Sequence, residues 1–152
     1  MSAFENLGIS KPILSALKDL GFEKPSEIQE KAIPYLLENE EDLVGLAQTG
    51  TGKTAAFGIP LLQKINVKSN KTQALILSPT RELGQQITEQ LDLYGKNLKG
   101  LRTLAVYGGA SIERQLRGLK KGAQIVVATP GRLLDLLNRK AANLKNIDYL
   151  VL

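Results

Sequence analysis

The sequence of 152 residues has no histidine, no cysteine and only seven aromatic side chains, four Tyr and three Phe. Without cysteine there is no disulfide framework, and without cysteine and histidine there is no zinc or iron–sulfur site of the usual ligand set. A cysteine nucleophile and a Ser-His-Asp triad are excluded on the same grounds. Any chemistry must therefore use carboxylates, Lys, Arg, hydroxyl groups, backbone amides or a metal ion held mainly by oxygen.

Long apolar runs are also missing. No stretch approaches the roughly 18 apolar residues of a membrane span. The first residues lack the basic start and apolar run of a signal peptide. We therefore expect a soluble, cytoplasmic protein that does not contact a membrane. The length predicts one domain, with a core large enough to fold without disulfides or a structural metal.

Charge is distributed unevenly along the chain. Residues 1–95 carry 9 Lys and Arg against 12 Asp and Glu, a net of −3, whereas residues 96–152 carry 11 against 3, a net of +8. Such an asymmetry indicates that the C-terminal part meets a polyanion. A solvated basic face is the alternative explanation.

Short apolar runs alternate with helical patterns along most of the chain. Leu83, Ile87, Leu91 and Tyr94 recur every three or four positions and so share one helix face. Two further helices are expected at residues 112–119 and 133–137. Buried strands are expected at residues 43–47, 74–77, 104–107, 125–128 and 147–152. This alternation predicts an α/β fold with an open, mainly parallel sheet and helices on both faces.

Two helices are expected ahead of the first strand. An apolar face from Ile13 to Leu20 predicts the first, which ends at Gly21 as its C-cap. The second begins near Pro25 and runs through Ile28 to Ile33. We expect both helices to pack on the outside of the sheet, near the first nucleotide-binding loop.

A glycine-rich loop joins the predicted strand at residues 43–47 to a helical run. Glycines let backbone amides point at phosphate oxygens, and the helix N-terminus adds a positive dipole end. Lys53 is placed to reach the β- and γ-phosphates, and the Thr54 hydroxyl to hold Mg²⁺. The pattern departs from the P-loop consensus at its first position, which is Ala47 instead of Gly. The loop comprises Gln48, Thr49, Gly50, Thr51, Gly52, Lys53 and Thr54.

A block at residues 21–29 precedes this loop and contains two side chains suited to a base. The Gln29 amide has the donor and acceptor that pair with an adenine edge, and Phe22 is placed to stack on the base. Such pairing would select ATP over GTP. Taken alone, a residue such as Gln29 is far more often an ordinary exposed helix residue than a ligand contact.

The complete set of motifs resembles the DEAD-box family of ATP-dependent RNA helicases, in its first RecA-like domain. Residues 21–29 look like the Q motif, with Phe4 as its upstream aromatic, and Ala47 to Thr54, A-Q-T-G-T-G-K-T, look like motif I. P-T-R-E-L at residues 79–83 resembles motif Ia, Gly108-Gly109 the GG motif, and T-P-G-R at residues 129–132 motif Ib. We accordingly divide the chain into an N-terminal helical region, 1–38, and a partial RecA-like domain, 39–152.

The resemblance implies a role for each matching residue. Phe22, Lys24 and Gln29 would bind the adenine end of ATP, and Gln48 to Thr54 its phosphates and Mg²⁺, with Lys53 and Thr54 as the catalytic pair. One strand of RNA would be lined by Pro79, Thr80, Arg81, Gly108, Gly109, Thr129, Pro130, Gly131 and Arg132.

The protein segments that would line RNA can also be interpreted from their chemistry, without the family resemblance. Each follows a predicted strand, at the edge of an open α/β sheet where ligands gather. Backbone amides, glycines and Arg suit phosphate and sugar, which predicts little sequence preference. The alternatives are a tight turn at Gly108-Gly109 and a simple helix start at Thr129-Pro130. Arg114, Arg117 and Lys121 share one helix face and would add positive potential as an electrostatic guide.

Part of the helicase machinery lies outside the sequence. In the family, D-E-A-D would follow Leu152, and an S-A-T motif and a second RecA-like domain come later. We therefore expect a portion of a longer helicase that binds nucleotide without hydrolysing it. Two readings remain beside this one: a non-catalytic clamp that binds nucleotide and RNA, and a DNA-directed helicase or other RecA-like ATPase.

Overall fold

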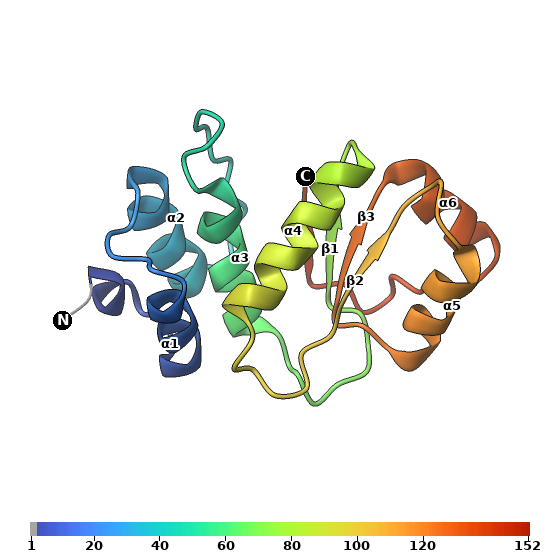
Figure 1. The fold of residues 1–152 in the computed structure, drawn as a ribbon, viewed down its shortest axis with the longest axis horizontal. Helices are drawn as coiled ribbons and strands as arrows, with labels where there is room; N and C mark the ends of the chain where they lie inside the picture. The colour runs from blue at the N-terminus through green and yellow to red at the C-terminus, as the bar shows by residue number, and fades with distance from the viewer. Residues whose placement is uncertain (1–2) are drawn as a thin grey trace. The chain divides into compact units, whose positions relative to one another are not determined.

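The computed structural model describes residues 3–152, which form two compact units. The first comprises the residues up to Lys64 together with Leu93–Leu98, and the second comprises Ile65–Asp92 and Lys99–Leu152. Along the chain the elements are η1 (Ala3–Leu7), α1 (Lys11–Asp19), α2 (Glu27–Glu38), α3 (Lys53–Lys64), β1 (Ala74–Leu77), α4 (Arg81–Tyr94), β2 (Thr103–Val106), α5 (Ile112–Lys121), β3 (Ile125–Ala128), α6 (Pro130–Asn138) and β4 (Tyr149–Val151) (Figure 1).

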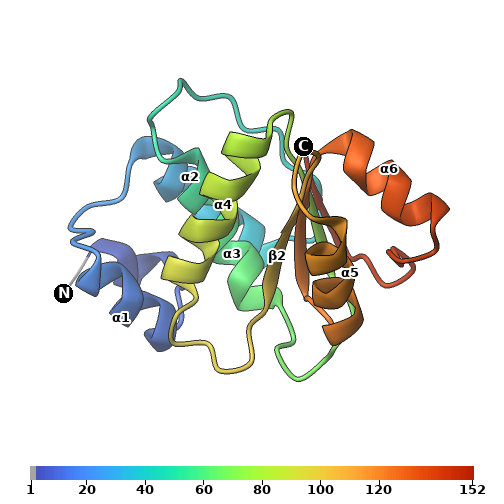
Figure 2. The same cartoon turned by 45° about the vertical axis from the view of Figure 1, so that its right-hand side comes forward.

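The second unit is built on a four-stranded sheet in the order β2-β3-β1-β4. Every pairing is parallel, with Ala74 opposite Ile125 and Tyr149, and Thr103 opposite Ile125. Helix α4 lies on one face of the sheet, and α5 and α6 lie on the other (Figures 1 and 2). This confirms the expected α/β fold. Because the strands are parallel, all their carboxyl ends meet at one edge.

The two central strands, β1 and β3, form where apolar residues are buried on both faces of the sheet. All four residues of β3 are buried, as expected for a central parallel strand. One core cluster lies between the sheet and helices α5 and α6. Its buried members are Leu75, Val106, Ala123, Val126, Ala128, Leu133 and Leu136.

The first unit contains the helices that precede the glycine-rich loop. Helix α1 ends as expected at Gly21, whose φ of 79° only glycine adopts at little cost. The Phe22 amide donates to the Leu17 carbonyl and the Gly21 amide to the Lys18 carbonyl, both at 3.0 Å, which completes a Schellman motif. Helices α2 and α3 pack against each other.

One predicted strand is wrong. Residues 43–47 form no strand, and Val44 and Leu46 are 84% and 89% exposed. An apolar run becomes a strand only when a neighbour accepts its backbone hydrogen bonds, and no described strand pairs with this one. The other predicted strands are confirmed, with β2 shifted by one residue and β4 shortened to three.

Two loops at the opposite, amino edge of the sheet are held by one buried side chain. Gln124 is fully buried, and its Nε2 donates to the carbonyls of Val67, Ser69 and Gly100 at 3.2, 2.9 and 3.1 Å. Its Oε1 accepts the Arg102 amide at 2.6 Å. Gln124 thus fixes the loop between α3 and β1 and the loop between α4 and β2 to the start of β3. Within residues 3–152 no helix is long and apolar enough to cross a membrane.

Candidate nucleotide and RNA sites

The glycine-rich loop closes tightly at the start of α3. Gly50 and Gly52 have φ angles of 80° and 84°, in the left-handed region that favours glycine. The Thr51 hydroxyl donates to the Gln48 carbonyl at 2.6 Å, and the Ala56 amide donates to the Gly52 carbonyl at 3.1 Å. The loop therefore ends directly in a helix N-terminus whose first amides have no intrahelical partner.

The Lys53 side chain folds back over this loop. Its Nζ donates to the Ala47 carbonyl at 2.9 Å, while the side chain remains exposed. The ammonium thus lies over the backbone turn formed by residues 47–53. A phosphate entering the turn would offer a charged acceptor in place of a neutral carbonyl, and charge-assisted hydrogen bonds are the stronger kind.

Gln29 joins the second helix to the glycine-rich loop. It is only 4% exposed, so its reading as an ordinary exposed helix residue is wrong. Its Oε1 accepts the Ser26 amide at 3.0 Å, and its Nε2 donates to the Gly52 carbonyl at 3.2 Å. A Cβ at position 52 would lie 2.3 Å from that Nε2, so this approach requires glycine. Each end of the amide retains capacity for one further hydrogen bond.

Phe22 belongs to an aromatic cluster in the same unit. Its ring centroid lies 5.9 Å from that of Phe4 and 5.8 Å from that of Tyr94, and both pairs are edge-to-face. Phe4 is buried and Phe22 is half-buried. The cluster therefore fixes the orientation of the Phe22 ring and leaves part of it accessible. Lys24, two residues further on, is exposed.

In the second unit the predicted RNA residues gather at the carboxyl edge of the sheet. Pro79 and Thr80 follow β1, Gly108 and Gly109 follow β2, and residues 129–132 follow β3, as the sequence predicted. The two glycines and residues 79–81 are exposed, as are Pro130 and Gly131. A Cβ added at Gly108 or Gly131 would meet no atom within 4 Å, so the backbone at both positions is open to a ligand.

Two threonines start helices at this edge. Thr80 Oγ1 accepts the Leu83 amide at 3.2 Å, and the Thr80 carbonyl accepts the hydroxyl of the buried Ser78 at 2.8 Å. Thr129 is the N-cap of α6 with Pro130 at the first helical position, as predicted. The Thr129 hydroxyl oxygen accepts no capping hydrogen bond, so that acceptor is not used by α6.

The two arginines of this edge are linked by a polar network. The Arg81 guanidinium lies over the Tyr107 ring, 5.0 Å from its centroid. The Tyr107 carbonyl accepts Gln115 Nε2 at 3.0 Å. The Gln115 Oε1 in turn accepts Arg132 Nη1 at 3.0 Å. The Tyr107 hydroxyl also accepts Gln85 Nε2 at 2.8 Å.

Sequence reasoning missed the residues that make this network, namely Tyr107, Gln85 and Gln115. A signal for Gln115 was present. It lies among Ile112, Leu116 and Leu119 on the apolar face of α5 and is 5% exposed. A polar residue on the buried face of a helix requires hydrogen-bond partners.

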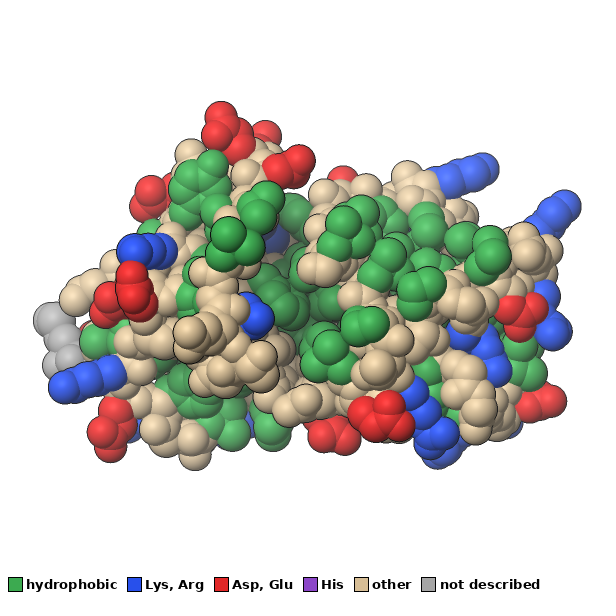
Figure 3. Space-filling view, turned by 90° about the horizontal axis from the view of Figure 1, so that it is seen from above, with side chains coloured by type: hydrophobic (Ala, Val, Ile, Leu, Met, Phe, Trp, Pro, Cys, Tyr) green, Lys and Arg blue, Asp and Glu red, His purple; other side chains and the backbone are tan. Residues whose placement is uncertain are grey.

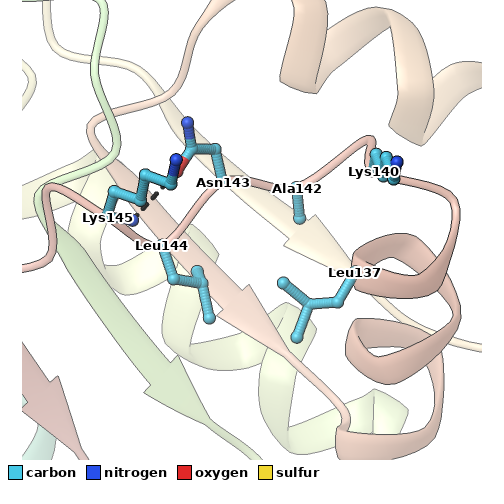
Figure 4. Close-up of a pocket in the computed structure, with 6 residues that line it drawn as sticks. All are labelled: Leu137, Lys140, Ala142, Asn143, Leu144 and Lys145. Carbon is cyan, nitrogen blue, oxygen red and sulfur yellow. Dashed lines mark hydrogen bonds between the residues drawn. The ribbon is translucent and has the colours of Figure 1, made fainter.

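A shallow, open hollow lies elsewhere, between the end of α6 and the segment before β4. Figure 4 shows Leu137 and Leu144 directed toward each other, and the Lys145 amide donating to Asn143 Oδ1 at 2.9 Å. None of the predicted site residues lines this hollow.

Charge differs between the two units. The second carries 13 Lys and Arg against 6 Asp and Glu, whereas the first carries 7 against 9. In the face drawn in Figure 3, basic side chains are spread out and do not form one patch. The basic excess thus accompanies the unit that bears the predicted RNA edge. No cluster of three acidic side chains suited to a metal occurs within residues 3–152.

A parallel α/β sheet and a glycine-rich loop that opens a helix are features that this chain shares with the class of P-loop proteins. More narrowly, the chain belongs to the DEAD/DEAH box helicase family, whose sequence model matches residues 26–152.

Relatives support the same assignment. The chain is 48% identical over its whole length to the DEAD-box ATP-dependent RNA helicase CshA of Geobacillus kaustophilus and spans 32% of that protein. It is 50% identical over 99% of its length to the ATP-dependent RNA helicase DeaD of Escherichia coli and spans 24% of it. The chain thus spans about a third or less of these relatives.

Solved structures agree with the fold. A DEAD box protein from Methanococcus jannaschii has a TM-score of 0.91 and 45% identity, over 99% of this chain and 40% of that one. A variant of Saccharomyces cerevisiae Dbp5, bound to RNA and ADP BeF3, has a TM-score of 0.84 and 35% identity, over 97% of this chain and 37% of that one. These neighbours establish the RecA-like character of the fold.

Proposed function

We propose that this chain is the ATP-binding and RNA-binding portion of an ATP-dependent RNA helicase that unwinds short RNA duplexes using ATP hydrolysis. Membership of the DEAD/DEAH box helicase family supports this proposal. The single observation that carries it is the hydrogen bond from Gln29 Nε2 to the Gly52 carbonyl. It brings the residue suited to read adenine into contact with the loop suited to hold phosphate, so one ligand containing both groups can meet both.

The nucleotide would bind to residues of the first unit. Gln29 retains one N–H and one lone pair, which match N7 and the N6 amino group of adenine. Phe22 offers an accessible part of its ring for stacking, and Lys24 lies close in sequence. The amides of residues 49–54 would face the phosphates, and Lys53 would leave the Ala47 carbonyl for the β- and γ-phosphates.

Magnesium would accompany the nucleotide. The chain offers the Thr54 hydroxyl at the second position of α3, which fits one ligand position of an ion that otherwise keeps phosphate oxygens and waters. When bound, Mg²⁺ would neutralise charge on the phosphates. The acidic and water-orienting groups needed for hydrolysis are expected from other parts of the protein, so we propose that this chain binds ATP without turning it over.

RNA would bind to the carboxyl edge of the sheet in the second unit. Arg81 and Arg132 supply charged donors, and the open backbone at Gly108 and Gly131, with the exposed Gly109 beside them, admits close approach of a sugar–phosphate chain. The basic excess of this unit supports a polyanionic partner. Because these groups address phosphate and sugar, binding would show little sequence preference.

A titration with a fluorescent ATP analogue tests the nucleotide site. We expect binding by the chain, and a loss of about tenfold or more in Lys53→Ala, since a charge-assisted contact to phosphate is removed. Lys64→Ala, at the other end of α3, is the matched control. Unchanged binding by Lys53→Ala would overturn the loop assignment.

A second measurement tests the rest of the proposal. Phosphate release in the presence of RNA should stay at the background level for the chain, and competition between RNA and DNA oligonucleotides reports which polyanion it prefers. RNA-stimulated ATP hydrolysis by the pure chain would contradict the proposal that this chain binds ATP without hydrolysing it.

The proposal has two further parts. The chain divides into an N-terminal helical region that ends at residue 38 and a partial RecA-like domain that begins at residue 39, and the protein is cytoplasmic.

A further inference from the structure

Two arginines of the proposed RNA edge come from different helices, yet one short loop contacts both. Arg81 begins α4, and its guanidinium lies over the ring of Tyr107 at 5.0 Å. Arg132 lies in the first turn of α6, and its Nη1 approaches the Ala110 carbonyl at 3.5 Å. Tyr107 and Ala110 are the two ends of the loop that contains Gly108 and Gly109.

Gln115 connects this loop to one of the two arginines. It is buried, and its amide is used at both ends, since Nε2 donates to the Tyr107 carbonyl and Oε1 accepts from Arg132. An amide in this position fixes the loop backbone and one arginine at the same time. A side chain that only accepts, or only donates, cannot replace it.

The other arginine lies near the same loop. Gly109 has a φ of 76°, and a Cβ built there would lie 3.5 Å from Arg81 Nη1, an ordinary van der Waals distance. The guanidinium thus lies over the ring of Tyr107 and close to Gly109. The Tyr107 ring is itself fixed, because its hydroxyl accepts Gln85 Nε2 from the next turn of α4.

We propose that Tyr107 and Gln115 are positioning residues, which hold Arg81 and Arg132 in a fixed arrangement for two phosphates of one RNA strand. The inference rests on the proposed function, because it assumes that RNA binds at this edge. Guanidinium groups keep further N–H donors after these contacts. Holding the arginines in place before binding reduces the side-chain entropy lost when RNA arrives.

Double-mutant cycles measure this arrangement through the affinity of the chain for an oligouridylate strand. Tyr107→Leu removes the aromatic face, and we expect roughly two- to fivefold weaker binding in the presence of Arg81. In an Arg81→Ala background the same change should have no further effect, since its target is gone. Tyr107→Phe keeps the face and should bind almost as tightly as the unaltered chain.

Gln115→Met gives the second, independent cycle. The change keeps the volume of the side chain and removes both hydrogen bonds, so we expect weaker RNA binding that disappears in an Arg132→Ala background. Binding of the ATP analogue should be unchanged in every variant, because none touches the nucleotide residues. If Gln115→Met fails to fold, the Tyr107 cycle on the protein surface decides the question.

The outcomes separate the two proposals. If Arg81→Ala and Arg132→Ala leave RNA binding unchanged, RNA does not bind at this edge and the proposed function is wrong there. Suppose instead that Arg81→Ala and Arg132→Ala both weaken RNA binding, and that the free-energy effects of Tyr107→Leu and Gln115→Met add to the effects of these arginine changes. The positioning role is then wrong, whereas the proposal that RNA binds at this edge is supported. If only one of the two cycles shows no coupling energy, the positioning role of the residue tested in that cycle, Tyr107 or Gln115, is wrong.

Discussion

At the scale of single residues, Lys140 is the one described non-glycine residue with a positive φ, 57°. It follows the C-cap of α6, where its amide donates to the Leu137 carbonyl and the next amide to the Leu136 carbonyl. This is the position at which helices commonly place glycine. The left-handed conformation is costly for a residue with a Cβ, so the site stores a small amount of strain.

Lys140→Gly should relieve that strain. We expect the free energy of unfolding to rise by about 0.5–1 kcal/mol, as measured by urea denaturation. Lys145→Gly is the control, because Lys145 is exposed in a turn without a positive φ. There, added freedom of the unfolded chain should lower stability slightly. Equal effects of the two changes would show that the backbone at position 140 is not strained.

Asp92 gives a pH-dependent prediction. Burial raises the pKa of Asp92, although a hydrogen bond from the Thr103 hydroxyl partly lowers it. A carboxyl with a raised folded pKa contributes stability below its unfolded pKa of about 3.9 and loses it as pH rises through the folded pKa. Asp92→Asn removes this titration, so it should gain stability relative to the unaltered chain between pH 4 and pH 7.

Denaturation at both pH values measures that difference. Glu89→Gln, an exposed change on the same helix, is the matched control. A stability difference for Asp92→Asn that does not vary with pH would contradict the assignment.

At the scale of elements, Gln124 joins two loops to the start of β3. Gln124→Leu would leave three carbonyls and the Arg102 amide without this partner. We expect a loss of about 2–4 kcal/mol in the free energy of unfolding, because unsatisfied buried polar groups are costly. Gln86→Leu, at an exposed position of α4, should change little. Comparable stability of the two variants would mean that water replaces the lost contacts.

The same scale shows what the sequence alone could predict. The strands at residues 74–77 and 125–128 were predicted to the residue, because continuous apolar runs there are buried on both sides. The strand predicted at residues 43–47 does not form, because strand formation depends on pairing that the residues of one segment do not encode. The network around Tyr107 also escaped prediction, since it joins side chains from three segments far apart in sequence.

Some features of the candidate sites could likewise be predicted from the sequence, and others could not. The positions of the three RNA segments could be predicted because motif and strand end coincide, whereas the glycine-rich loop was located by its motif alone, since no described strand precedes it. The contact of Gln29 with Gly52 could not be derived from spacing, since it depends on how α2 packs against α3. Their roles in binding ATP and RNA stay predictions.

At the scale of the whole molecule, the basic side chains of α5 should act on RNA through their field. Arg114, Arg117 and Lys121 are exposed and lie opposite the buried face of that helix. Replacing all three by Gln should slow RNA association at low salt by several fold and leave dissociation nearly unchanged, because steering acts before contact. The difference should vanish at high salt, where charges are screened.

Stopped-flow mixing with labelled oligouridylate measures both rates. Replacing Lys11, Lys18 and Lys31 by Gln removes the same charge from the first unit instead of the second and is the control. A faster dissociation for the α5 variant would show direct contact with RNA instead of steering.

The close approach of Gln29 to Gly52 has a consequence for how this sequence can change over generations. The two positions are 23 residues apart, yet any side chain at position 52 would collide with the amide at position 29. A shorter residue at position 29 would open the space and at the same time remove the hydrogen bond that holds the loop. Position 52 is thus restricted twice, by the amide of Gln29 and by its own φ of 84°, so a change at position 29 alone does not free position 52 to accept another residue.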